Sequence, residues 1–230
     1  MTQDAKKPAK SFAAKPAASR RRRDADQTRE DILQAALEEF STMGHSGARI
    51  DRIAARAGIS KPMIYDYFGD KDAIYAAALR EAYVQIRRGE AELALDPDDP
   101  CAAVRELVHF TMDHFRAKPW FIQMLNSENL LGGATVAKLH DASEIQSTLV
   151  TRLGDVLAQG VRQGVFRRRV DPAEFYVFMA SLCYFPISNM HTLRAVFRLP
   201  IDQPWLDRRA EDAADMLLAY LMQPVGDDLR

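Results

Sequence analysis

A glycine between two short amphipathic segments constrains the fold of this chain more than any other feature. The segment before it carries Ile50, Ile53, Ala54 and Ala57, which have the spacing of one helical face. Gly58 follows, and glycine commonly ends a helix because it adopts a left-handed conformation without strain. The pattern therefore predicts a short helix that stops at a tight turn.

A second short helix is predicted directly after this turn. Ser60 is a candidate N-cap, and Pro62 falls in the first turn, where its missing N–H costs no helix bond. Ile64 and Phe68 are four residues apart and share the inner face. Two helices joined by a turn of about three or four residues form a helix-turn-helix, which we place at about residues 48–67.

A third helix is predicted before the motif, and a long one after it. Thr28 and Asp31 approximate a capping box at the start of a helix over residues 28–43, and Gly44 ends it. A helix beginning at Asp70 keeps its apolar period to about Leu95. We expect residues 26–86 to form a DNA-binding head joined by this long helix, without a flexible linker, to the rest of the chain.

The composition is that of a globular protein without membrane spans. Apolar residues make up 47% of the 230 residues and charged residues 27%. No run of 18 apolar residues exists, so we expect no membrane-spanning helix and a cytoplasmic location. The two cysteines, Cys101 and Cys183, have no metal-ligand spacing, and we expect both to be free thiols.

Positive charge is concentrated at the N-terminus. The formal net charge is −1, yet residues 1–27 hold eight basic and three acidic residues, whereas residues 28–75 hold six basic and eight acidic ones. We expect residues 1–25 to be a disordered arm, because they contain too few apolar residues to offset the entropy of ordering. Two interpretations of Arg20–Arg23 stay open. These arginines contact DNA, at its phosphates or in the minor groove, or they belong to a solvated linker and only add charge.

The chain after the long helix is predicted to be entirely helical. Residues 101–117, a segment restarting at Pro119, the stripes 145–161 and 173–185, and residues 207–222 all have helical periodicity. Gly132 and Gly133 mark a turn, and no alternating strand pattern occurs. We expect residues 87–230 to form one ligand-binding and dimerisation domain, in which the two stripes build a four-helix bundle with a second copy.

The head resembles the tetracycline-repressor (TetR) family of bacterial transcription regulators. The matching positions are Thr28, Ile32, Ala36, Phe40, Gly44, Ile53, Ala54, Ala57, Gly58, Ile59, Ser60, Ile64, Tyr65, Tyr67, Phe68 and Lys71. The match covers residues 28–75 closely, and the remainder is similar in its all-helical architecture alone. The resemblance implies an all-α fold, no cofactor, a homodimer on a pseudo-palindromic operator of double-stranded DNA, and release by a small-molecule effector.

Several residues of the head are expected to touch the operator. The DNA contacts predicted from the motif and the resemblance are Arg49, Ser60, Lys61, Pro62, Met63, Tyr65, Tyr67 and Lys71. Ala48 and Arg49 replace a hydroxyl pair that is frequent in the family, so Arg49 is expected to supply a charged phosphate contact instead. Asp66 and Arg52 are expected to face solvent.

An effector pocket is expected among the aromatic and sulfur-containing residues of the helical domain. The candidates are Phe110, His114, Phe115, Trp120, Phe121, Met124, Glu128, Met179, Cys183 and Tyr184. Residues of this kind at helical spacing are more often ordinary core, so each is a weaker candidate than the DNA contacts. His109, Asp113 and His114 lack a second ligand cluster, and we expect no metal site.

The sequence favours a ligand-responsive regulator, with repression preferred over activation. An enzyme would need a nucleophile–base pair, a metal cluster or a phosphate loop, and Gly132-Gly133 lacks the flanking pattern of such a loop. The remaining alternative is a helical small-molecule sensor or scaffold without sequence-specific DNA binding, which the acidic balance of residues 28–75 keeps open.

Overall fold

The computed structural model describes residues 17–139 and 148–224, and these residues are helical with no β-strand. The elements are α1 (Ala17–Gly47), α2 (Ile50–Ala57), α3 (Lys61–Phe68), α4 (Lys71–Glu92), α5 (Pro100–Ala117), α6 (Pro119–Leu130), the short 3₁₀ helix η1 (Val136–Lys138), α8 (Thr148–Arg162), α9 (Pro172–Ser188), α10 (Met190–Phe197) and α11 (Gln203–Met222). The all-α prediction is confirmed. Neither η1 nor α10 was predicted.

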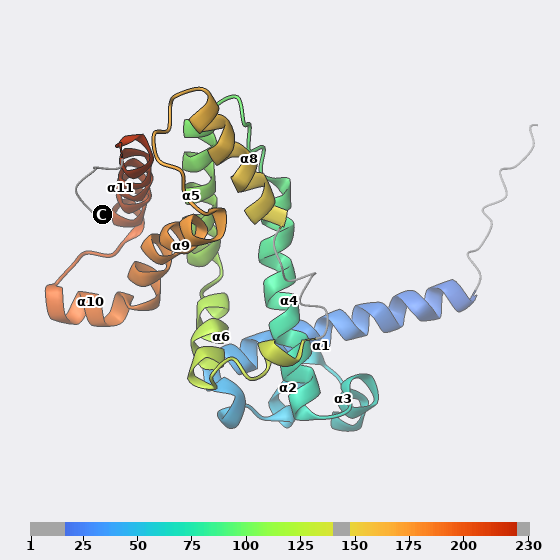
Figure 1. The fold of residues 1–230 in the computed structure, drawn as a ribbon. Coiled ribbons are helices and arrows are strands. Elements are labelled where there is room, and N and C mark those ends of the chain that lie inside the picture. Colours follow the sequence, from blue (N-terminus) through green and yellow to red (C-terminus); the bar gives the residue numbers. More distant parts are fainter. Residues whose placement is uncertain (1–16, 140–147, 225–230) are drawn as a thin grey trace, which may run out of the picture.

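Helices α1, α2 and α3 form the head at one end of the molecule (Figure 1). Its core contains Ile32, Phe40, Ile53 and Ile64, each at most 1% exposed. Near its C-terminal end, α1 is interrupted at Gly44, whose φ of 64° and ψ of 175° are not helical. A side chain at this position would strain the backbone, so the predicted helix break at Gly44 is correct.

The predicted start of α1 is wrong. The helix begins at Ala17 rather than Thr28, so a disordered arm is contradicted from Ala17 onward, and residues 1–16 lie outside the described part. Thr28 does not cap the helix, because its hydroxyl donates to the carbonyl of Asp24 one turn earlier, at 2.8 Å. Alanine and arginine are strong helix formers and no proline lies between Pro16 and Pro62, so helix propensity outweighs the polar composition of this segment.

Helix α4 leaves the head and runs beside α5 and α8 (Figure 1). Its first turn is capped by Asp70, whose carboxylate accepts the N–H of Ala73 at 2.7 Å. Its last carbonyls are capped from another helix, because the guanidinium of Arg152 on α8 donates to the carbonyl oxygens of Glu90, at 2.9 Å, and Leu93. Both ends of α4 are therefore fixed by side-chain hydrogen bonds.

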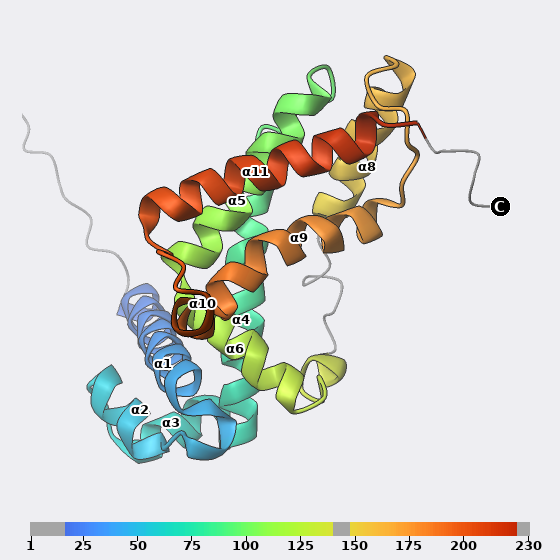
Figure 2. The same cartoon turned by 90° about the vertical axis from the view of Figure 1, so that its left-hand side faces the viewer.

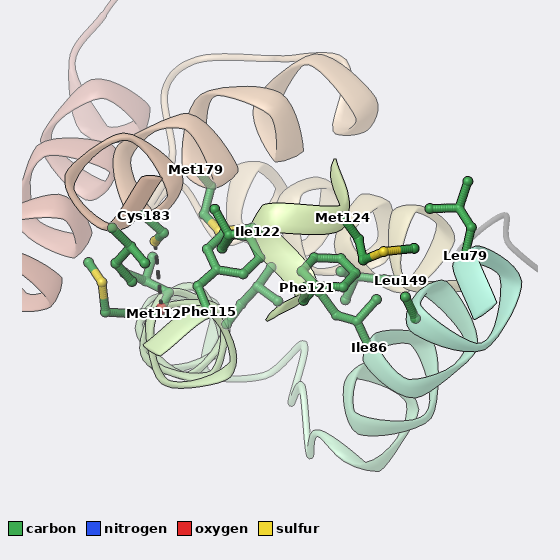
Figure 3. Close-up of a cluster of buried hydrophobic side chains, with 14 of the residues drawn as sticks. Leu79, Ile86, Met112, Phe115, Phe121, Ile122, Met124, Leu149, Met179 and Cys183 are labelled. Carbon is green, nitrogen blue, oxygen red and sulfur yellow. Dashed lines mark hydrogen bonds between the residues drawn. The ribbon is translucent and has the colours of Figure 1, made fainter. Parts of the chain in front are cut away.

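Side chains from five helices meet in one core around α5. Figure 3 shows the cluster, to which α4, α5, α6, α8 and α9 contribute Leu79, Ile86, Met112, Phe115, Phe121, Ile122, Met124, Leu149, Met179 and Cys183. The thiol of Cys183 donates to the carbonyl of Val108 at 3.8 Å, drawn as the dashed line. Helix α6 also packs against α1, so the head and the helical domain share a boundary.

The stripe 145–161 does not form a free dimer surface. Its apolar residues Leu149, Leu153, Val156 and Leu157 are buried inside the chain, where α8 packs on α4, α5 and α9. Residues 145–147 lie outside the described part. An amphipathic stripe predicts that a helix is packed but not against which partner, which is why the prediction failed.

Candidate DNA-reading head and effector cavity

The turn of the helix-turn-helix has the geometry expected of Gly58. This residue ends α2 with φ 67° and ψ 28°, and the N–H of Ile59 returns to the carbonyl of Ala54 at 3.1 Å. Ser60 occupies the predicted N-cap position of α3, although its hydroxyl makes no capping hydrogen bond. The Ser60 hydroxyl is consequently left facing outward with the exposed start of α3.

Helix α3 presents one face to solvent and one to the core. Lys61, Pro62, Met63 and Tyr65 are exposed, whereas Ile64 is buried. Tyr67 is half-buried and packs against the core of the head. The arrangement leaves the N-terminal half of the helix open, which is the part that a recognition helix inserts into the major groove.

The exposed start of α3 carries an ion pair that the sequence pattern did not reveal. The ammonium of Lys61 lies 2.9 Å from the carboxylate of Asp51 on α2. This hydrogen bond and the charge of Asp51 raise the pKa of Lys61. The lysine is therefore charged and already has a partner, which a DNA phosphate or base would have to replace.

A buried carboxylate organises the other helix of the motif. Glu39 of α1 is 1% exposed and accepts the backbone N–H of Arg49, the residue preceding α2, at 3.2 Å. The guanidinium groups of Arg52 and Arg56 lie 3.8 and 3.9 Å from the same carboxylate. Glu39 thus satisfies the backbone N–H of the N-cap residue of α2 from another helix. The side chain of Arg49 remains exposed.

Lys71 lies at the start of α4, beside the end of α1. Its ammonium approaches the carbonyl of Ser46 at 3.5 Å, and its side chain is half-buried. The predicted DNA contacts therefore divide into an exposed group around α3 and Arg49 and a more enclosed pair, Tyr67 and Lys71.

A cavity of about 340 Å³ lies between α4, α5, α6 and α9. Its lining consists of Tyr83, Ile86, Arg87, Phe115, Phe121, Leu125, Asn129, Tyr176, Val177, Ala180, Ser181 and Tyr184. Aromatic rings dominate, and hydroxyl, amide and guanidinium groups are interspersed. The volume and this mixture are typical of a site for a small organic molecule.

The polar groups of the cavity have defined protonation states. Burial raises the pKa of both Tyr83 and Tyr176, so both hydroxyls stay protonated at neutral pH, and that of Tyr176 donates to the carboxylate of Glu90 at 3.4 Å. The charge of Arg87 is neutralised by Glu90, whose two carboxylate oxygens each lie 2.6 Å from one guanidinium nitrogen. The cavity therefore offers neutral hydrogen-bond donors rather than a free positive charge.

Few of the predicted pocket residues line this cavity. Phe115, Phe121 and Tyr184 do. Met124, Met179 and Cys183 belong to the packed core instead, and Phe110 and Trp120 are partly buried against that core. The residues that were not predicted share a sequence spacing: Tyr83 and Arg87 are four apart on α4, and Tyr176 and Ala180 are four apart on α9, where the predicted Tyr184 continues the series.

His114 is buried in an aromatic cage beside the cavity. Its ring centroid is 5.3 Å from that of Phe121 and 5.8 Å from that of Phe110, and its Nε2 has no hydrogen-bond partner in the described structure. Burial, together with the charges of Lys118 and Arg87, lowers its pKa to about 4. The imidazole is therefore neutral at physiological pH.

Glu128 does not line the cavity and has a structural role. Its carboxylate accepts the N–H groups of Thr135, at 2.7 Å, and Val136, at 3.0 Å, which fixes the turn after α6. The other oxygen accepts the hydroxyl of Tyr75 on α4 at 3.2 Å. Helix α6 is thereby tied to α4 close to the head.

The described residues contain neither a metal-binding cluster nor a membrane-spanning helix. Within residues 17–139 and 148–224, no group of three or more His, Cys, Asp or Glu side chains has a geometry that could hold a metal ion. Both cysteines are free thiols. In the same part of the chain, no helix combines the length and apolarity needed to cross a membrane.

Family models match both parts of the chain. Residues 32–78 match the model described as bacterial regulatory proteins of the tetR family, and residues 100–217 match the tetracyclin repressor-like C-terminal domain. The first match coincides with the head and the start of α4, and the second with the helical domain from α5 onward.

Curated relatives and solved structures agree with these matches. The HTH-type transcriptional repressor NicS of Pseudomonas putida is 38% identical over 173 residues, which is 75% of this chain and 82% of the relative. The HTH-type transcriptional repressor SCO4008 of Streptomyces coelicolor is 31% identical over 157 residues, which is 68% of this chain and 76% of the relative. The solved structure of SCO4942 from Streptomyces coelicolor superimposes with a TM-score of 0.62 at 25% identity, covering 86% of this chain and 99% of the other. The chain therefore belongs to the tetR family of bacterial regulatory proteins, which are helix-turn-helix regulators of transcription rather than a family of enzymes.

Proposed function

We propose that the protein is a transcriptional repressor that binds a pseudo-palindromic DNA operator as a homodimer and leaves it when a small molecule occupies the α4–α5–α6–α9 cavity. The observation that carries the DNA-binding role is the exposed N-terminal half of α3, with Lys61, Met63 and Tyr65 on its surface. Repression is supported by the two relatives NicS and SCO4008, which are both repressors by name.

Each side chain of the head has a proposed task. Lys61 donates to a guanine edge or a phosphate, and Pro62 and Met63 contact a thymine methyl group. The hydroxyls of Ser60, Tyr65 and Tyr67 and the charges of Arg49 and Lys71 position the head on the DNA backbone. In a dimer, two such heads lie about one turn of DNA apart, roughly 34–36 Å, which accounts for a two-fold symmetric operator.

The dimer surface is assigned to the outer faces of α9, α10 and α11. In Figure 2 these three helices face the viewer, with no other described helix in front of them. Phe178 and Phe185 of α9, Phe197 of α10 and Met216 of α11 are each more than half exposed. Exposed apolar side chains grouped in this way mark a protein interface, and two long helices from each copy form a bundle.

The route from effector to DNA runs through α4 and α6. Helix α6 lines the cavity with Phe121, Leu125 and Asn129, and it also packs against α1 of the head. Helix α4 lines the cavity with Tyr83 and Arg87 and begins at the head. An effector that fits the cavity better when these helices are shifted therefore favours a dimer whose heads no longer match the operator.

The DNA-binding role is tested by an electrophoretic mobility shift with Lys61→Ala and the DNA upstream of the protein's own gene. Operator affinity should fall at least about tenfold, since a charge-assisted contact is lost, while the dimer and the unfolding temperature stay unchanged. Lys138→Ala, which removes the same charge from an exposed position in η1, is the matched control. Wild-type binding should also weaken steeply with added salt. Unchanged affinity of Lys61→Ala would refute the assignment of α3 as the recognition helix.

The effector role of the cavity has its own test. Ala180→Leu should fill part of the cavity from α9, where Ala180 is half-buried. Thermal shift with neutral aromatic probes, benzamide and phenol, should then detect stabilisation of the wild type and none of the variant, with DNA affinity retained by both. Equal stabilisation of both proteins would place the probes outside this cavity.

A further inference from the structure

A second cavity, of about 310 Å³, lies between α8 and the segment that leads from it to α9. Three arginines border it, namely Arg162 at the end of α8 and Arg168 and Arg169 in the segment. Leu157, Val161 and Pro172 supply apolar surface. It shares no lining residue with the α4–α5–α6–α9 cavity, and no residue of the head contributes to it.

The three arginines lack the acidic partners that other arginines of the helical domain have. Arg105 pairs with Glu211 and Asp215, and Arg116 pairs with Asp113 and Asp207. Among the described residues, by contrast, no carboxylate forms an ion pair with Arg162, Arg168 or Arg169. Asp171, which directly precedes the lining residue Pro172, instead accepts the N–H groups of Ala173 and Glu174 as the N-cap of α9.

Arg168 is held in place without being neutralised. Its backbone N–H donates to the carbonyl of Leu221 at 3.0 Å, and its guanidinium carbon lies 4.3 Å from the ring centroid of Tyr220. The Nε of Arg168 is buried and has no hydrogen-bond partner in the described part of the chain. A guanidinium fixed by backbone and ring contacts loses little entropy when it binds an anion.

Arg162 is oriented but keeps free donors. Its Nε donates to the side-chain oxygen of Gln159 at 2.8 Å, which leaves both terminal nitrogens of the guanidinium without a described acceptor. These two N–H groups form the fork that pairs with the two oxygens of a carboxylate or phosphate. Arg169 is exposed at the same rim.

We propose that this cavity binds a small organic anion, with its carboxylate or phosphate held by Arg162, Arg168 and Arg169 and a compact apolar body packed on Leu157, Val161 and Pro172. Three unpaired guanidinium groups around one hollow repel one another, so an anion relieves their repulsion as well as forming hydrogen bonds. The apolar floor favours an organic ligand over a bare inorganic ion.

The test uses isothermal titration calorimetry on the full chain with four probes. Hexyl phosphate and benzoate carry the proposed anionic group and apolar body, inorganic phosphate lacks the body, and benzamide lacks the charge. The two organic anions should bind. Inorganic phosphate should bind at least about fivefold more weakly than hexyl phosphate. Benzamide should show no binding that depends on the three arginines. Binding of hexyl phosphate should weaken as salt is raised.

Variants then locate the bound anion. The double variant Arg162→Gln, Arg169→Gln removes two exposed charges. Its affinity for hexyl phosphate should be at least about tenfold lower than that of the wild type, and its unfolding temperature should be unchanged. Arg208→Gln on α11, an equally exposed arginine, should bind like the wild type. Unaltered binding by the double variant, equal binding of hexyl phosphate and inorganic phosphate, or no binding of either organic anion would overturn the proposal.

Discussion

The hydroxyl of Tyr75 donates a hydrogen bond of 3.2 Å to the carboxylate of Glu128, and both side chains are at most 3% exposed. Tyr75 lies one turn into α4, where that helix leaves the head, and Glu128 lies near the end of α6. The bond thus joins two helices that border the α4–α5–α6–α9 cavity at the point where both reach the head. Burial and the charge of Glu128 raise the pKa of Tyr75, so the phenol keeps its proton.

Removing this hydroxyl should destabilise the protein measurably. Tyr75→Phe leaves the ring contact of 5.0 Å with Phe40 in place but deprives a buried carboxylate of one donor. We expect the free energy of unfolding to fall by about 1–2 kcal/mol in urea titrations. Tyr65→Phe, which removes an exposed hydroxyl of α3, should leave stability unchanged. Equal stability of Tyr75→Phe and wild type would mean that the bond contributes nothing.

The ion pair of Lys61 and Asp51 predicts that removing the acidic partner strengthens DNA binding, whereas removing the lysine weakens it. Asp51→Asn removes a negative charge that lies 2.9 Å from the lysine and occupies it in the free protein. Operator affinity should therefore rise, by about three- to tenfold, in fluorescence anisotropy titrations. Asp212→Asn on α11 makes the same charge change far along the chain and should have no effect. Weaker binding by Asp51→Asn would show that Asp51 positions Lys61 for DNA rather than competing with it.

His114 makes stability depend on pH in a defined window. Its pKa is about 4 in the folded protein, below the value of about 6.5 for an unfolded chain, so the unfolded state binds more protons between these values. The contribution of the neutral His114 to the free energy of unfolding is present above pH 6.5 and is lost as the pH falls towards 4. The loss should reach about 2 kcal/mol at pH 5.

The measurement compares unfolding of the wild type and His114→Leu at pH 7 and pH 5. The wild type should lose about 2 kcal/mol more than the variant over this interval. His191→Leu, which replaces an exposed histidine of α10, should follow the wild type. Parallel pH profiles of wild type and His114→Leu would contradict a depressed pKa at this position.

The dimer surface predicts a loss of assembly from one substitution. Phe178→Glu places a charge at an exposed apolar position of α9, and the protein should become monomeric in analytical ultracentrifugation. Operator affinity should fall by about a hundredfold or more, because the second head no longer binds intramolecularly. Leu130→Glu, at an apolar position of α6 that is 89% exposed, should remain dimeric. A dimeric Phe178→Glu would move the interface to another surface.

Local sequence signals predicted the head well. Gly58, Ile64 and Gly44 have the conformations or burial expected of them, because a left-handed turn and an inner helical face depend on neighbouring residues. The start of α1 was missed because the composition of residues 17–27 was given more weight than their helix propensity.

The cavity could not be predicted in the same way, because it depends on how helices meet. Helix α9 is apolar on all sides, so its pattern could not show that Met179 turns inward and Phe178 outward. Tyr83 and Arg87 line the cavity from α4, and the end of that helix is held by Arg152 of α8, which is 62 positions from its partner Glu90. Likewise, the capping of Arg49 by Glu39 spans ten residues and two helices, beyond any motif.

Helix α6 borders the α4–α5–α6–α9 cavity with one side and α1 of the head with another. A substitution on this helix that adapts the cavity to a new compound also alters the surface on which the head rests. In the proposed mechanism, we therefore expect changes of inducer specificity through α6 to be accompanied by changes in basal repression. Changes through α9, which packs on α5, α6, α8, α10 and α11, are expected to leave basal repression unaltered.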